Sequence, residues 1–313
     1  MRVLCLLAPL LVCGCTLFNV NVSLFGEEGE LEEHVLQESD SDAKVALVTV
    51  DGLIHSGRGV SFFGDAGTVE CLKEQLNRAA VDEDVAAVVL RINSPGGEAV
   101  ASDLMWHEVR RFRKRTGKPV AAWISGVGAS GAYYLACGAD AIVAHPNSVV
   151  GSIGVIVHLV NLKGLMDKLG LGVEVIKSGA RKDTGSPFRE LTEQERVDVQ
   201  GMINRLYERF LGIVAEARGR DKNALRPIAD GRVMGAEAAR AAGLVDAVGY
   251  LEDALSIAMK KAKLKRAKLV QYQRPGTWRP NVYSPWATMR RLDALLEPGL
   301  WMIAPQFFSG SDE

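Results

Sequence analysis

The chain has 313 residues, of which 48% are hydrophobic and 24% are charged, and these proportions exclude a fully disordered protein. Single α/β domains reach about 200–250 residues, so this length suits one large domain with a tail at each end. The formal net charge of −1 gives no overall electrostatic basis for binding nucleic acid.

The first fifteen residues (1–15) have the layout of an export signal. Arg2 supplies a positive charge, and the apolar run 3–12 is too short to cross a bilayer, which requires about 20 apolar residues. The sequence Val12-Cys-Gly-Cys15 resembles a lipoprotein processing site, in which Cys15 becomes the lipidated first residue. An ordinary cleaved signal peptide is the alternative. Both interpretations place the folded part of the protein outside the cytoplasm.

Residues 16–43 are predicted to form a solvated, acidic tether. Eight acidic residues lie between positions 19 and 43, with few large apolar residues among them. A segment of this composition buries too little apolar surface to fold by itself. The character of the sequence changes at Lys44, where we place the start of the folded domain (44–264).

From Lys44 onward the sequence alternates between two periodicities. Runs rich in β-branched residues at 44–54 and 85–92 predict strands, and apolar residues at helical spacing predict a helix between them. The alternation continues with a helix at 98–116, a strand at 119–124, a short helix at 130–137, strands near 141–144 and 152–157, and helices at 191–218, 235–242 and 251–263. Nearly continuous apolar strands between helices are typical of a parallel sheet buried on both faces, so the sequence predicts an α/β fold.

The C-terminal tail, residues 265–313, begins in a basic run and continues as a Pro/Trp-rich segment. The basic run spans 260–268, and we interpret it as a solvated face that favours the negative end of the last predicted helix. Binding of this run to anionic lipid is the alternative. We assign no role to the Pro/Trp-rich part.

The segment 125–136 (SGVGASGAYYLA) contains the first candidate for chemistry, because it joins a predicted strand to a predicted helix through small residues. Small residues permit a sharp turn, which presents Ser130 at a helix N-terminus, where free backbone N–H groups stabilise negative charge on a substrate oxygen. Ser130 is therefore a candidate nucleophile. The alternative is a plain N-cap serine at a closely packed junction.

A second candidate segment, 91–97 (RINSPGG), follows another predicted buried strand. Paired glycines allow the backbone to approach a ligand closely. The N–H of Gly97 together with that of Gly131 would form an oxyanion hole with two donors, the feature that usually contributes most to acyl transfer. Taken alone, the segment is equally consistent with a tight turn made of standard turn residues.

A serine nucleophile also needs a general base. None of the five histidines lies in a local motif, although residues distant in sequence can meet in a fold, and lysine is the other option. A lysine base must be neutral, and lowering its pKa of about 10.4 by three units requires roughly 4 kcal/mol of burial or charge repulsion. Lys177 and Lys182 both lie in the loop-like segment 176–189, which follows a predicted strand. Their spacing alone does not decide between them.

Four segments, in this order, resemble those of the bacterial signal peptide peptidase family of serine proteases. They are 93–97 (NSPGG), 129–134 (ASGAYY), 151–155 (GSIGV) and 177–187 (KSGARKDTGSP), and the resemblance runs from about Lys44 to Lys263. The fold of that family is related to the Clp protease and crotonase folds. The resemblance therefore implies a repeated β-β-α superhelical fold with a single catalytic domain.

The resemblance also implies roles for individual residues. Ser130 matches the family nucleophile, and Lys182 matches the general base. Ser152 matches a third polar residue that orients the lysine amine, and Gly97 and Gly131 match the positions whose N–H groups face the oxyanion. The chain departs from the family at position 132, where alanine replaces the usual glycine. This small change should leave the turn at the nucleophile intact.

The implied reaction is peptide hydrolysis through an acyl-enzyme, and it needs no metal ion or cofactor. The implied substrates are remnant signal peptides or other unfolded, membrane-proximal peptides. Single-domain members of the family form homo-oligomeric rings in which serine and lysine come from adjacent subunits, so we expect a ring here. We expect it on the extracytoplasmic side of a bacterial cell envelope, anchored by the lipoprotein-like leader instead of the spanning helix common in the family.

Two other functions are weighed against this one. A catalytically inactive scaffold of the same fold could act at the membrane surface, but the presence of both Ser130 and Lys182 argues against it. A crotonase-like acyl-CoA enzyme would share the oxyanion hole while using carboxylates in place of a Ser-Lys pair. The export leader argues against that enzyme, because acyl-CoA is cytoplasmic.

Overall fold

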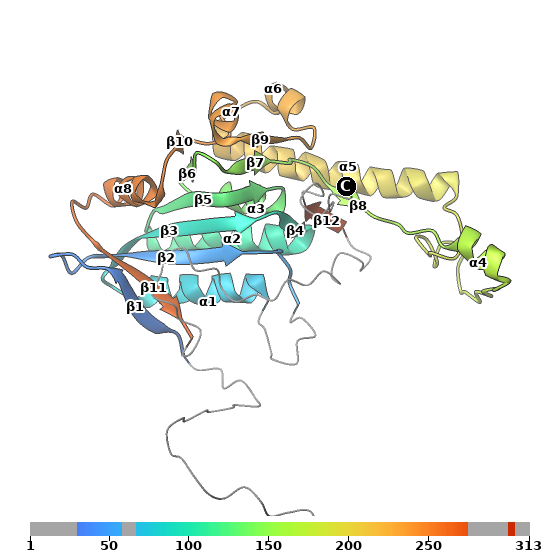
Figure 1. Cartoon of the computed structure of the whole chain (residues 1–313), viewed down its shortest axis with the longest axis horizontal. Coiled ribbons are helices and arrows are strands. Elements are labelled where there is room, and N and C mark those ends of the chain that lie inside the picture. Colours follow the sequence, from blue (N-terminus) through green and yellow to red (C-terminus); the bar gives the residue numbers. More distant parts are fainter. Residues whose placement is uncertain (1–29, 58–66, 275–299, 304–313) are drawn as a thin grey trace, which may run out of the picture.

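The computed structural model describes residues 30–57, 67–274 and 300–303 of the chain. The predicted export leader, the lipidation site Cys15 and most of the Pro/Trp-rich tail lie outside these residues. The described part is a mainly parallel sheet with helices on both faces, which confirms the α/β class (Figure 1).

The main sheet has the strand order β1-β11-β2-β3-β5-β6-β10. The strands from β11 to β10 are parallel to their neighbours, and β1 pairs antiparallel with β11 at the edge. The bounds of these strands are β1 (Glu32–Gln37), β2 (Lys44–Asp51), β3 (Val85–Ser94), β5 (Val120–Ala129), β6 (Ala141–Ala144), β10 (Ala247–Val248) and β11 (Lys268–Gln273). Two short strands continue the sheet beside the end of β5: β7 (Val149–Gly151) and β9 (Val233–Gly235).

Helices cover both faces of this sheet, and buried apolar side chains form one layer on each face. One face packs against α1 (Thr68–Val81), α2 (Ala99–Thr116) and α3 (Gly131–Ala136), and the other packs against α8 (Leu251–Lys261). In β2, Val48 belongs to the first layer and Leu47 to the second, and both side chains are fully buried. Full burial of such a side chain is worth about 1.5–3 kcal/mol. The continuous apolar runs seen in the sequence therefore arise because both faces of each strand are covered.

The remaining helices are α4 (Lys163–Leu169), α5 (Glu193–Arg218), α6 (Lys222–Leu225), a 3-10 turn (Arg226–Ile228) and α7 (Ala236–Ala241). The C-terminal half of α5 is anchored in the core through residues such as Phe210 and Val214. The segment from α4 to the start of α5 extends away from the sheet (Figure 1). We call residues 159–190 the arm.

The prediction of a solvated tether is wrong for Glu32–Gln37, which forms β1, and the predicted domain limits of 44 and 264 are too narrow for the sheet. Beyond the second limit, Lys268–Gln273 forms β11 between β1 and β2. Edge strands commonly carry charged side chains, because charge discourages pairing with other molecules. The charged residues of β1 are typical of an edge strand, and the same composition led to the prediction of a solvated tether.

Two other predicted strands are also corrected. The strand expected at 152–157 is interrupted, because β7 ends at Gly151 and β8 comprises only Ile156–Val157. Ser152 has a φ of 51°, a conformation that breaks a strand. No strand precedes Lys182, since residues 171–176 are exposed and pair with no neighbour among the described residues.

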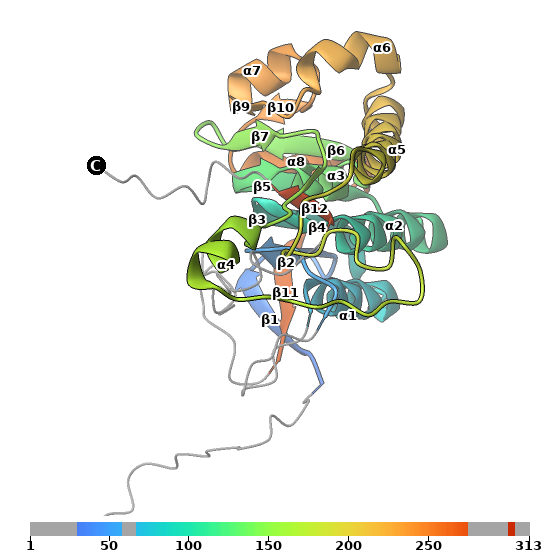
Figure 2. The same ribbon diagram turned by 90° about the vertical axis from the view of Figure 1, so that its right-hand side faces the viewer.

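A second, three-stranded sheet lies at the end of the molecule where β3 and β5 finish. Its strands are β4 (Gly96–Glu98), β12 (Leu300–Ile303) and β8, with β12 in the middle and antiparallel to both neighbours. Four residues of the C-terminal tail therefore lie against segments that the sequence assigned to the site (Figure 2). Across the described ranges, no helix combines the length and the hydrophobicity needed to span a bilayer.

Candidate active site

Ser130 lies at the sharp junction between β5 and α3. Its backbone has φ 53° and ψ −120°, a conformation that costs a non-glycine residue about 1–3 kcal/mol. Two backbone hydrogen bonds maintain this conformation: the Ser130 N–H donates to the Gly151 carbonyl at 2.7 Å, and the Ser130 carbonyl accepts from Tyr134 N–H at 2.9 Å. The small residues identified in the sequence thus form the predicted strand-to-helix turn.

The Ser130 side chain is buried but has no hydrogen-bond partner. Its residue is 1% exposed, and its Oγ atom contacts no donor or acceptor among the described residues. It occupies the N-cap position of α3 without making a capping hydrogen bond, so the N-cap interpretation does not explain it. Leaving a buried hydroxyl unpaired costs about 1–3 kcal/mol. An unpaired group of this kind at a strained position indicates a functional site.

Helix α3 is fixed to the body of the protein by its two tyrosines. The Tyr133 hydroxyl donates to the Leu244 carbonyl at 2.7 Å, and the Tyr134 ring packs against Phe210 with 4.9 Å between centroids. The Tyr134 hydroxyl donates to the Asp103 carboxylate. Burial, with a contribution from that carboxylate, raises the pKa of Tyr134 well above its ordinary value, so the phenol stays a donor. The turn that carries Ser130 is therefore rigid.

Gly97 lies in β4, which contacts both α3 and the bridge residue Ile54. The Ile54 N–H donates to the Gly96 carbonyl and the Glu98 N–H donates to the Ile54 carbonyl, each at 2.9 Å. Because successive backbone groups of a strand point in opposite directions, the Gly97 N–H points the other way, toward Met302 of β12. A Cβ atom on Gly97 would lie 1.9 Å from the Ile54 carbonyl oxygen, so only glycine fits.

The second predicted oxyanion donor is Gly131, the first residue of α3. Its N–H has no partner within the helix, because the first N–H groups of any helix lack one. The strand that leads to it is tied to the Gly97 segment through Asn93, whose Oδ1 accepts from Val127 N–H at 3.1 Å. Both candidate donors are therefore presented from elements that contact one another.

Ser152 lies beside Ser130 because β5 and β7 pair with Ala129 opposite Gly151. Ser152 is buried, and its N–H donates to the Arg232 carbonyl at 2.6 Å. It shares with Ser130 a positive φ, which is rare outside glycine. The structure thus brings together Ser130, Gly131 and Ser152, with Gly97 on the adjoining strand.

Lys182 lies elsewhere, in the exposed arm. It occupies a turn in which its N–H donates to the Gly179 carbonyl at 3.1 Å, and its side chain makes no hydrogen bond or ion pair with any described residue. Lys177 differs, because its amine is engaged by Asp183 at 2.6 Å and by the Ala180 carbonyl at 2.9 Å. Of the two lysines, Lys182 is the one whose amine is available. A single chain does not bring it to Ser130.

The charged side chains beneath the turn of Lys182 were not among the predicted site residues. Asp183, Arg189 and Glu195 form an ion-pair cluster beneath its turn. Thr192 and Glu195 form a capping box at the start of α5, with reciprocal bonds of 3.2 and 2.9 Å. The pattern Thr-x-x-Glu before a helix was a readable signal for that capping box, but no sequence rule joins Arg189 to Asp183.

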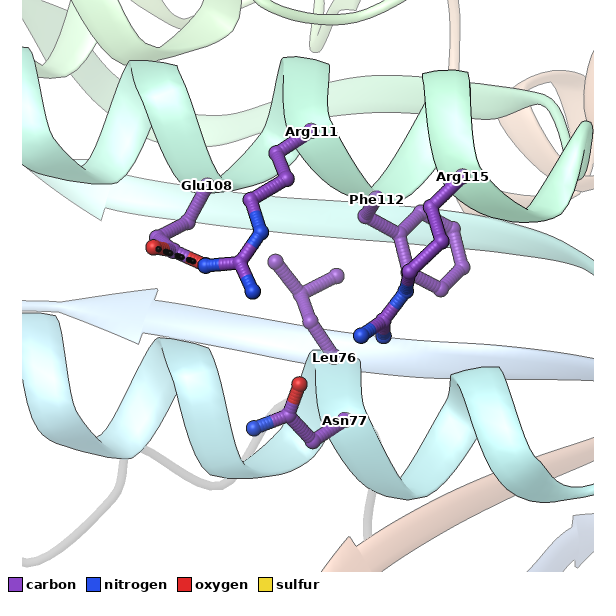
Figure 3. A pocket seen from close by; sticks show the side chains of 6 residues that line it. All are labelled: Leu76, Asn77, Glu108, Arg111, Phe112 and Arg115. Carbon is purple, nitrogen blue, oxygen red and sulfur yellow. Dashed lines mark hydrogen bonds and ion pairs between the residues drawn. The ribbon is translucent and has the colours of Figure 1, made fainter.

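Two hollows among the described residues have space for a ligand or a water molecule. One, of about 350 Å³, lies next to Ser152 between residues 153–156, helix α5 and residues 229–231. The other lies between α1 and α2, lined by Leu76, Phe112 and an Arg111–Glu108 pair, and has room for about one water molecule (Figure 3). Only the first adjoins the candidate site.

Comparison with known proteins places the chain among peptidases. The model of peptidase family S49 matches residues 112–265, which include Ser130, Ser152 and Lys182. A protein of Enterococcus faecium named as a signal peptide peptidase is 34% identical over 281 residues, covering 88% of this chain and 81% of its own length. A protein of Methanocaldococcus jannaschii named as a protease is 44% identical over 191 residues, covering 61% of each chain.

Protease 4 of Salmonella typhi is 33% identical over 235 residues, covering 75% of this chain but 37% of the longer relative. The chain thus spans little more than a third of that protein. The expectation of a Clp protease/crotonase-like fold is confirmed, because peptidase family S49 has that fold. Since a relative of similar length is matched over most of both chains, the chain belongs to peptidase family S49, together with proteases of the signal peptide peptidase type.

Proposed function

We propose that this protein is a serine endopeptidase that uses a Ser-Lys dyad, with Ser130 as nucleophile and Lys182 as general base. The observation that carries the proposal is the Ser130 hydroxyl, which is buried and unpaired on a strained turn. No described residue, whether histidine or lysine, is hydrogen-bonded to this hydroxyl. The preference for a lysine base is supported by the resemblance of the segment 177–187 to the family and by the Lys182 amine, which no described residue engages.

In the proposed reaction the neutral Lys182 amine takes the Ser130 proton as Oγ attacks the peptide carbonyl. The N–H groups of Gly97 and Gly131 stabilise the oxyanion of the tetrahedral intermediate. Lys182 then gives its proton to the departing amine, and a water molecule hydrolyses the acyl-enzyme. Ser152 orients the lysine amine from its position beside Ser130.

We further propose that Lys182 acts on the Ser130 of an adjacent subunit in a homo-oligomeric ring. The arm that carries Lys182 exposes a row of large apolar side chains, and Ile176 is 93% exposed. The exposed members are Leu159, Val160, Leu162, Leu165, Leu169, Leu171, Val173, Val175, Ile176 and Phe188. Monomeric proteins rarely expose so many neighbouring apolar residues, so a second copy is the proposed cover.

The proposed substrates are extended peptides, including remnant signal peptides and other unfolded, membrane-proximal segments. Support comes from β12, a stretch of the chain itself that lies as an antiparallel strand against Gly97. A peptide bound in the same way would place its backbone beside the proposed oxyanion donors, as in other cases of strand addition. Association with the outer face of the membrane through Cys15 is part of the proposal.

The test measures hydrolysis of a signal-peptide-like fluorogenic substrate by the full-length chain in mild detergent. Ser130→Ala and Lys182→Ala should each abolish activity while assembly is retained. If the site is shared, mixing the two inactive variants during assembly should restore about a quarter of the wild-type activity, because a quarter of the interfaces pair two intact groups. Full activity of Lys182→Ala would refute the base assignment. A folded, assembled wild type that is inactive on a broad peptide panel would support the scaffold alternative.

A further inference from the structure

The turn that carries Lys182 is exposed, yet it is held by a dense set of charged hydrogen bonds. The carboxylate of Asp183 accepts from Arg189 Nε at 2.9 Å and from Arg189 Nη2 at 2.8 Å. It also accepts from Lys177 Nζ at 2.6 Å. The residue after the proposed base is therefore fixed on two sides, although the surrounding arm has little apolar packing.

The second carboxylate of this cluster, Glu195, is 3% exposed in the first turn of α5. Its two oxygens accept from Arg189 Nη1 at 2.8 Å and Arg189 Nη2 at 2.6 Å, which makes a bidentate pair. The Thr184 hydroxyl donates to the same carboxylate at 2.8 Å. Arg189 therefore bridges the turn of Lys182 to the start of α5, and a guanidinium is the side chain best suited to a planar bridge of this kind.

Both carboxylates remain charged over the working range of an enzyme. Hydrogen bonds from Arg189, and then from Lys177, hold the pKa of Asp183 well below its ordinary value. Hydrogen bonds from Arg189, from the Thr192 backbone and from Thr184 do the same for the pKa of Glu195. Because the pKa of each carboxyl is depressed in the folded state, its hydrogen bonds stabilise the fold at pH values above the unfolded-state pKa and are lost only in acid. The bridge is thus intact at neutral pH.

Helix α5 connects this bridge to the nucleophile. Its first turn holds the Arg189–Glu195 pair, and farther along Phe210 packs against Tyr134, four residues after Ser130. A continuous helix of 26 residues is stiff over this length. The position of the Lys182 backbone relative to the core therefore depends on Arg189 and Glu195.

We propose that Arg189 and Glu195 are positioning residues of the peptidase, which hold the Asp183 side of the turn so that Lys182 is delivered in a fixed geometry. This inference rests on the proposed role of Lys182 as general base. It assigns a catalytic consequence to two residues that touch neither substrate nor Ser130. A misplacement of about 1 Å at a catalytic group can cost on the order of 100-fold in rate.

The experiment compares Arg189→Gln and Glu195→Gln with the wild type as full-length chains in mild detergent, using steady-state kinetics. Each variant should lower kcat about 10-fold or more with KM changed by less than about twofold, because the base is misplaced while peptide binding is intact. The matched control is Arg196→Gln, the same Arg-to-Gln change at the residue after Glu195; among the described residues the Arg196 side chain makes only an exposed pair of 3.7 Å with Glu193. The control should retain wild-type kcat.

A double-mutant cycle separates positioning from general damage. In the Lys182→Ala background, adding Arg189→Gln should change the slow labelling of Ser130 by a fluorophosphonate less than about twofold, because the residue acts through the missing amine. Hydrogen exchange should accelerate in residues 176–190 and remain unchanged in α3. Retention of wild-type kcat by both glutamine variants would overturn the proposal. So would an Arg189→Gln change that slows the labelling of Ser130 equally in the wild-type and Lys182→Ala backgrounds. Full activity of Lys182→Ala alone would instead refute the proposed base.

Discussion

The Ser130 region and the arm with Lys182 are built in opposite ways. Ser130 lies between two parallel strands and a fully buried helix, so the topology of the sheet fixes its position. Lys182 lies on an exposed segment whose order comes from ion pairs and a capping box. Among the described residues, the Ser130 hydroxyl of the buried region and the Lys182 amine of the arm both lack a hydrogen-bond partner.

This contrast explains how one chain can carry both members of the proposed dyad without joining them. An exposed arm with apolar side chains is suited to docking on a second copy, whereas a buried strained turn is suited to holding a group still.

Gly97→Ala should remove one oxyanion donor from the buried half. Its Cβ would lie 1.9 Å from the Ile54 carbonyl oxygen, so β4 must move. Loss of one such donor typically costs about 10²–10³ in kcat, or roughly 2.7–4 kcal/mol. The measurement is kcat on the fluorogenic peptide, with Gly235→Ala as control because a Cβ there meets nothing within 4 Å. Equal activity of Gly97→Ala and the control would remove Gly97 from the oxyanion hole.

Ile176→Ser should weaken the exposed half without affecting the fold of a single chain. If the side chain is covered by a neighbouring subunit, its loss should weaken each interface by about 1.5–3 kcal/mol. The free energy of unfolding of the separated chain should change by less than about 0.5 kcal/mol. Sedimentation measures assembly. The matched control is Val81→Ser, which changes an exposed apolar residue on α1, outside the arm. Unchanged assembly would show that Ile176 is not covered by a second copy.

Asp82→Asn should destabilise the sheet edge by about 1 kcal/mol at neutral pH, because Asp82 accepts from Tyr272 at 2.7 Å and from Lys44 at 3.1 Å. Burial alone would raise the pKa of the Asp82 carboxyl, but these hydrogen bonds outweigh it and lower the pKa from 3.8 to about 2. A carboxyl whose pKa is depressed in the folded state stabilises the fold at pH values above its unfolded-state pKa. This contribution is lost as the pH falls through the folded-state pKa. Urea unfolding at several pH values measures the free energy of unfolding of both proteins. The difference in this free energy between wild type and variant should shrink below pH 3.8. A constant difference down to pH 2 would contradict this account.

The same contrast explains what the sequence could predict. The turn at Ser130 and the glycine at position 97 were readable, because a tight turn or a close backbone approach restricts residue type locally. The helices were readable from apolar spacing, and α5 was predicted within two residues of its observed start. The local backbone of the Ser130 region was therefore predictable from the sequence, at the turn and at the close approach of Gly97 to Ile54.

The arm was not predictable to that level. The choice of Lys182 over Lys177 depended on family resemblance, and the structure adds that Lys177 is engaged by Asp183. The bridge from Arg189 to two carboxylates depends on side-chain geometry that spacing does not encode. Strand β1 was missed for a related reason, because its partner β11 lies more than 230 residues away in the sequence.

Met302→Pro should have the smallest effect, and it tests whether β12 occupies the peptide position. Met302 lies opposite Gly97, and proline at that point removes an N–H and disfavours strand pairing. If β12 must leave before a peptide binds, weakening it should lower KM a few-fold with kcat unchanged, and the largest possible decrease is the inverse of the fraction of wild-type molecules in which the strand is already detached. The control is Met259→Ala on α8, outside the small sheet. A higher KM would mean that β12 supports the site, and the peptide would then bind along another surface of β4.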